Sequence, residues 1–138
     1  MATGTKRARG LFSISVNKSI LGMKVMNTER EDLGKIEDLV IDTRDSRVAY
    51  AILSFGGLLG LGDKHFVIPW QALTIDLSQK VAVLKIDKQR LENAPGFDKE
   101  SWPDMDDAAW AASIHSHYGY RPYWEQRESP SKIDEPLP

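Results

Sequence analysis

Hydrophobic and polar positions alternate in short runs along the first two thirds of the chain. Six segments are rich in β-branched and other apolar residues, and polar turns separate them. These expected strands are residues 20–26, 34–42, 47–55, 65–70, 73–77 and 81–86. Short, evenly spaced strands with turn residues between them are typical of a small all-β barrel or sandwich. The pattern therefore predicts a mainly β fold with about six strands.

Two of the expected strands carry additional information. In residues 34–42 the apolar phase slips at Asp38, which predicts a β-bulge or a strand that turns a barrel corner. Residues 47–55 are apolar on both faces instead of one. A strand of this kind is covered on both sides, so we expect it near the centre of the sheet.

The pattern also predicts two short helices at the periphery of this fold. Asp87 is a suitable N-cap for a helix over residues 88–93. A second helix is expected from about Asp104 to Tyr118, because acidic residues occupy its first turn and Gly119 follows its last residue. The fold class is therefore a small β-barrel with a short helix and a C-terminal helical extension.

Composition divides the chain into four parts. Residues 1–18 are expected to be a flexible basic arm, 19–93 the barrel domain, 94–124 a helical extension on the barrel or on a partner, and 125–138 a disordered tail. The extension holds most of the aromatic residues of the chain. Among them Trp110 and Tyr118, with Ile114 between them, recur every four residues and form one apolar stripe.

Charge and composition exclude several kinds of function. Lys and Arg number 18 and Asp and Glu number 20, so the formal net charge is −2. This balance opposes general nucleic-acid binding, which needs a basic surplus. The absence of cysteine excludes disulfides, thiolate metal sites and cysteine nucleophiles. No segment approaches the roughly 20 apolar residues that span a bilayer, so we expect a cytoplasmic protein, with peripheral membrane contact left open.

No motif for catalysis or metal binding is complete. Residues 57–64 resemble a phosphate-binding loop but place Asp63 before the lysine, and no nucleophile elbow surrounds Ser54. The three histidines lack zinc-site spacing. We expect His65 at the surface or the barrel rim and His115 on a helix flank as an ordinary polar residue. The sequence therefore predicts no enzyme, no cofactor, and no catalytic or metal-ligating residue.

Several motifs in fixed order resemble the PRC-barrel domain family, which is named for the cytoplasmic domain of the photosynthetic reaction-centre H subunit and includes the C-terminal domain of a ribosome maturation factor. The matching segments cover roughly residues 19–93 and comprise residues 21–25, 32–42, 48–57, 61–64, 67–70 and Leu73. Residues 93–97 and 118–124 are similar to the extension of stand-alone bacterial members. The resemblance implies a small β-barrel and a non-catalytic interaction module.

We therefore expect a protein-interaction or assembly module that associates with itself as a homodimer or higher oligomer, and with another protein in addition. Aromatic and leucine side chains are common anchors of interfaces. The candidate interaction residues are Leu58, Leu59, Leu61, Trp102, Trp110, Tyr118, Tyr120, Tyr123 and Trp124. In the simpler alternative, the extension packs only on the barrel of its own chain and forms no interface with a partner. The other alternative is a barrel that binds a small ligand or metal ion at a rim with Asp38, Asp63, His65 and Arg121.

Overall fold

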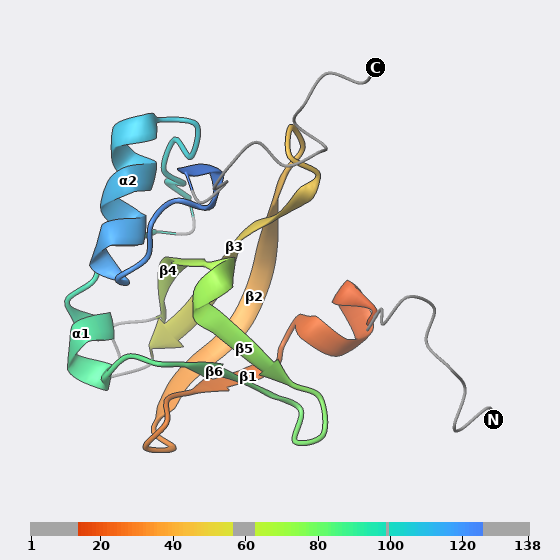
Figure 1. The fold of residues 1–138 in the computed structure, drawn as a ribbon. Helices are drawn as coiled ribbons and strands as arrows, with labels where there is room; N and C mark the ends of the chain where they lie inside the picture. The colour runs from red at the N-terminus through yellow and green to blue at the C-terminus, as the bar shows by residue number, and fades with distance from the viewer. Residues whose placement is uncertain (1–13, 57–62, 99, 126–138) are drawn as a thin grey trace.

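Seven strands form one sheet in the computed structural model, which describes residues 14–56, 63–98 and 100–125. The strands are β1 (Lys24–Met26), β2 (Asp32–Asp42), β3 (Arg47–Gly56), β4 (Asp63–Pro69), β5 (Leu73–Asp76), β6 (Val81–Leu84) and β7 (Gly96–Phe97). Their order in the sheet is β5-β6-β1-β2-β3-β4-β7, and only the β1–β6 pair is parallel (Figure 1). Within the described ranges the two edges do not pair, so the sheet stays open. The predicted mainly β fold is confirmed, and the seventh strand comes from the extension.

Among the described residues, five short helical segments connect and cover the strands. They are η2 (Val16–Ile20), η4 (Trp70–Ala72), α1 (Lys88–Glu92), α2 (Ala108–His117) and η5 (Tyr123–Glu125). Both α-helices begin after an aspartate N-cap, of which Asp87 was predicted from the sequence. Asp87 accepts a hydrogen bond from the Arg90 amide at the start of α1, so its predicted role as N-cap is confirmed. Because Asp107 and not Asp104 caps α2, that helix begins four residues later than predicted.

The predicted irregularity of β2 is confirmed as a β-bulge. Ile36 lies opposite Leu53 and Asp38 lies opposite Ile52, so Glu37 is an extra residue without a partner in the ladder. A bulge redirects one side chain and increases the local twist of the strand. It therefore frees the Glu37 side chain from the regular alternation of the sheet.

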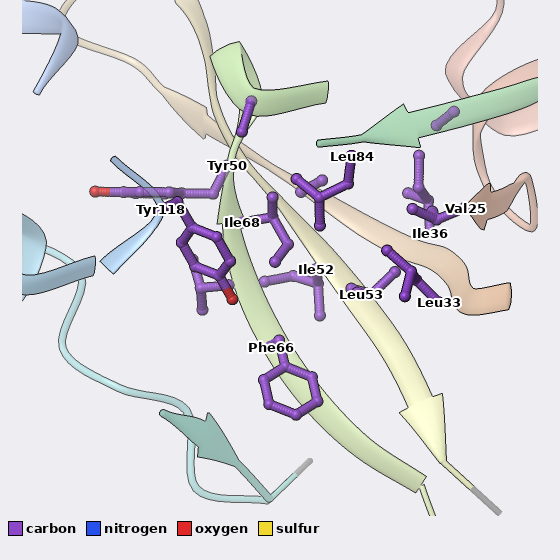
Figure 2. Close-up of a cluster of buried hydrophobic side chains, with 14 of the residues drawn as sticks. Val25, Leu33, Ile36, Tyr50, Ile52, Leu53, Phe66, Ile68, Leu84 and Tyr118 are labelled. Atoms are coloured by element: carbon purple, nitrogen blue, oxygen red, sulfur yellow. The ribbon is translucent and has the colours of Figure 1, made fainter. Parts of the chain in front are cut away.

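Strand β3 lies between β2 and β4 and is buried on both faces, as predicted. Leu53 is paired with Ile36 of β2 and Phe66 of β4, and these side chains share the face that forms the barrel core. Figure 2 shows this cluster, with Leu53 on β3, Ile36 on β2 and Phe66 on β4. Tyr50 contacts α2 from the other face. The extension is therefore the reason why β3 is apolar on both sides.

The extension is held against the barrel by the predicted stripe and by backbone contacts. Ile114 and Tyr118 are buried, whereas Trp110 is half-buried and packs edge-on against Tyr50 with the two ring centres 5.7 Å apart. The Arg90 guanidinium donates a hydrogen bond of 2.7 Å to the His117 carbonyl and so joins α1 to the end of α2. Among the described helices none is long and apolar enough to cross a bilayer.

Candidate interaction surface

One side-chain cluster joins the β2 bulge to the extension. His65 of β4 lies opposite Phe97 of β7, and its Nε2 lies 2.8 Å from Oε2 of Glu37. The His65 ring centre lies 5.7 Å from the ring of Phe97, which in turn lies 5.5 Å from that of Trp102. We call Glu37, His65, Phe97 and Trp102 the His65 cluster.

The His65 cluster is buried at its base and open at its outer edge. His65 is only 6% exposed, so its predicted place at the surface is wrong: the bulge brings Glu37 to one side of the ring, and β7 brings Phe97 to the other. The Glu37 side chain is 35% exposed and Trp102 is 48% exposed. The cluster thus presents a carboxylate and an aromatic ring to the outside, above a buried imidazole.

The hydrogen bond to Glu37 determines which ring nitrogen of neutral His65 carries the proton. A carboxylate only accepts hydrogen bonds, so Nε2 of His65 carries the proton that it donates to Glu37. Its other nitrogen, Nδ1, is buried and makes no hydrogen bond to any described residue. His65 therefore fixes one oxygen of Glu37, and the second oxygen keeps its full capacity to accept.

Ser54 lies beside His65 in the β3–β4 register, which brings a serine, a histidine and an acid together. A nucleophilic serine must be within hydrogen-bond reach of its base. Ser54 is only 4% exposed, and His65 Nδ1 accepts no hydrogen bond from it. The three residues come from three strands, so no local sequence motif could reveal their proximity. In this geometry they do not form the nucleophile–base contact of a catalytic triad.

A second cluster anchors the end of the extension to the β2–β3 hairpin. The Tyr123 hydroxyl donates a short hydrogen bond to Oδ2 of Asp42, and the Arg47 guanidinium lies 4.2 Å from the centre of the Tyr123 ring. Trp124 packs edge-on against Tyr123 and against His115. We call these five residues the extension anchor.

Burial and contacts shift the pKa values of groups in the extension anchor and of the neighbouring Tyr50. The Tyr123 hydroxyl holds the pKa of Asp42 below its ordinary value, because it donates a hydrogen bond to the charged carboxylate. Burial is the main cause that raises the pKa of Tyr123, and the charge of Asp42 adds to it. Burial and the same charge raise the pKa of Tyr50 to about 12. The neutral phenols and the charged carboxylate are thus the forms that the folded chain favours.

His115 is a buried member of this anchor and not the polar flank residue that the sequence suggests. Its exposed fraction is 0%, and its Nδ1 lies 2.8 Å from the carbonyl oxygen of Ala111. Burial lowers the pKa of His115. The prediction is wrong because Tyr50 of β3 and Tyr123 and Trp124 of η5 pack around the ring from two other segments.

The candidate interaction residues differ in their exposure. Trp102 and Trp124 are exposed, Trp110 and Tyr120 are half-buried, and Tyr118 and Tyr123 are buried within the chain. Leu58, Leu59 and Leu61 lie outside the described residues. Of the proposed rim residues, Asp38 and Arg121 are exposed, Asp63 begins β4, and His65 is buried against Glu37. Among the described residues no three His, Asp or Glu side chains converge as metal ligands.

Comparison with known proteins identifies one matching family. The family model of the PRC-barrel domain matches residues 17–91. A solved structure of similar fold is that of RimM from Pseudomonas aeruginosa, described as a 16S ribosomal RNA processing protein. It is 23% identical, the match covers 61% of this chain and 50% of that chain, and the TM-score is 0.40. The chain thus spans half the length of that protein. No curated protein matches.

Proposed function

The chain belongs to the PRC-barrel domain family, and from this membership we propose that it is a non-catalytic protein-interaction or assembly module that associates with itself. Residues 19–93 form the module in this proposal, and residues 94–124 supply much of its contact surface. We also assign it to the cytoplasm, which fractionation of the source cells tests.

The observation that carries the proposal is the exposure of two tryptophans on the extension. Trp102 is 48% exposed and Trp124 is 37% exposed, although tryptophan is a large, mostly apolar side chain. Tryptophan is enriched among the residues that contribute most to protein–protein binding. Tyr123 packs edge-on against Trp124. The proposal also includes Trp110, Tyr118, Tyr120, Leu58, Leu59 and Leu61 as interaction residues.

Light scattering after size exclusion tests self-association. We expect a dimer or higher oligomer at high micromolar concentration, and Trp102→Ala and Trp124→Ala should each shift the equilibrium toward monomer by about tenfold or more, as removal of an interface anchor does. Leu77→Ala is the matched control, because Leu77 is 45% exposed but lies in the β5–β6 turn. A strict monomer at high micromolar concentration overturns the proposal.

A second candidate function is the binding of a small ligand or a metal ion, and the unpaired buried polar atoms favour it. Nδ1 of His65, Nε2 of His115 and the hydroxyl of Tyr118 are buried without a hydrogen-bond partner among the described residues. Buried polar atoms of this kind require a further hydrogen-bond partner, and a water molecule is the simplest one. A ligand that fills them would raise the melting temperature by mass action. A screen of divalent metals and metabolites without any shift counts against this candidate.

A further inference from the structure

We propose that the His65 cluster binds a lysine or arginine side chain, and that the chain's own N-terminal segment, residues 1–13 of a second copy, supplies it. This inference rests on the proposed self-association and gives it a chemical basis. The fixed carboxylate, the aromatic edge and the distribution of charge at the cluster all favour a basic side chain.

Glu37 is a carboxylate held in position before any ligand arrives. Its Oε2 accepts a hydrogen bond from His65 Nε2, and His65 cannot move freely because it is only 6% exposed and packs on Phe97. Among the described residues Glu37 has no other hydrogen bond or ion pair. Its Oε1 is therefore free to accept from a cation. A group that is already ordered loses less conformational entropy when it binds.

The aromatic edge of the cluster suits the same ligand. Trp102 exposes half of its surface beside Phe97, and an indole ring is the best aromatic partner for an ammonium or guanidinium group. The methylene groups of a lysine or arginine also cover apolar surface. A basic side chain could thus contact both rings and place its charge toward Glu37.

The local charge favours a cation over an anion. Within two residues of the four cluster members along the chain there are six acidic residues and three basic ones. They are Glu37, Asp38, Asp63, Asp98, Glu100 and Asp104 against Lys35, Lys64 and Lys99. A negative patch attracts a positive partner and repels a negative one.

The N-terminal segment has the complementary charge. Residues 1–13 contain Lys6, Arg7 and Arg9 and no acidic residue. The described chain begins next to η2, which leads into β1, three strands from β4 in the sheet (Figure 1). Strand β2, which carries Glu37, is the direct neighbour of β1, so the assignment to a second copy rests on the proposed self-association and on the complementary charge, and the peptide test below distinguishes it from binding within one chain.

The first test measures dimerisation of the full chain at low salt by sedimentation equilibrium. Glu37→Gln and the triple variant Lys6→Ala, Arg7→Ala, Arg9→Ala should each raise the dissociation constant about tenfold, as loss of a charge-assisted hydrogen bond does. Combining them should add little, because both remove the same contact. Salt at 0.5 M should weaken the wild-type dimer by screening. Glu29→Gln is the control, since it removes the same charge from the exposed β1–β2 turn.

The second test measures binding of the N-terminal segment to the His65 cluster without requiring a dimer. A labelled synthetic peptide of residues 1–13 is titrated into the full-length triple variant, and binding is followed by fluorescence anisotropy. We expect saturable binding that Glu37→Gln or Trp102→Ala, introduced in that background, weakens about tenfold. Glu29→Gln should leave it unchanged, and a peptide with alanine at positions 6, 7 and 9 should not bind. Trp102 is exposed, so its variant keeps the test valid if Glu37→Gln disturbs folding.

The outcomes separate this inference from the proposed function. A dimer that is indifferent to Glu37→Gln and to the arm variant overturns the inference and leaves self-association standing. A monomer that does not bind the peptide overturns both. A monomer whose triple variant binds the peptide overturns the assignment to a second copy, because the segment then occupies its own chain's cluster.

Discussion

At the scale of single residues, Tyr123 joins segments that are 81 positions apart through its bond to Asp42. A hydrogen bond to a charged group contributes more to stability than one between neutral groups. Tyr123→Phe should therefore lower the free energy of unfolding by about 1 to 2 kcal/mol. Urea unfolding at pH 7 measures it, with Tyr120→Phe as the control in the same segment. An unchanged free energy would show that the bond contributes nothing to stability.

The same pair gives a dependence on pH. Because the pKa of Asp42 is lowered in the folded chain, its stabilisation is present above the unfolded value of about 3.9 and is lost as pH falls through the folded value. Tyr123→Phe removes the main cause of this shift. Wild type and variant should therefore differ in stability at pH 7 and converge as the pH falls toward 3. A constant difference across this range would contradict the assignment.

Residue-level predictions from the sequence succeeded where the cause is local and failed where it is not. The caps of α1 and α2 depend on side chains within three positions, so Asp87 could be assigned and Asp107 lay within the expected first turn. His65 and His115 were misplaced because the groups that bury them come from other strands and from η5. The sequence indicates only part of the role of Glu37. The slip in the apolar phase predicts the bulge, but nothing in the sequence identifies His65 as the hydrogen-bond partner of Glu37.

At the scale of elements, the close approach of β2 to β3 depends on Gly34. Its φ is +106°, and a Cβ there would overlap the carbonyl oxygen of Ser54 on β3. Gly34→Ala should cost about 3 kcal/mol or more, because the strand must move as well as accept an unfavourable dihedral. Gly22→Ala is the matched control, since its φ is +89° but its Cβ would meet open space, and about 1 to 2 kcal/mol is expected. Equal losses by thermal unfolding would refute the proposed steric cause.

The elements themselves were largely predictable because hydrophobic periodicity records which faces are buried. The six expected strands correspond to β1 to β6. Strand β7 was not expected, since Gly96 and Phe97 carry no alternating pattern and pair with β4 only through tertiary contact. The parallel pairing of β1 with β6 is likewise a property of the fold and leaves no local signal.

At the scale of the whole molecule, the extension completes the burial of the sheet. Tyr50 on the outer face of β3 contacts both Trp110 and His115 of α2. A chain that ends after Asn93 should expose this face, bind a hydrophobic dye such as ANS and melt at a lower temperature. Trp110→Ala in the full chain removes one of these two contacts and should lower the melting temperature less than the truncation does. A truncated chain with unchanged melting temperature and no dye binding would show that the barrel needs no cover.

The double-sided burial of β3 also has a consequence for synthesis. The ribosome completes β3 and β4 by Pro69, but the covering residues continue to Glu125, about 55 positions later. At about 5 to 20 residues per second, this interval is roughly 3 to 11 seconds. During that time the nascent chain carries an uncovered apolar sheet face, which is the kind of surface that chaperones bind. Synthesis of the covering residues thus ends the period in which the nascent chain is most prone to aggregate.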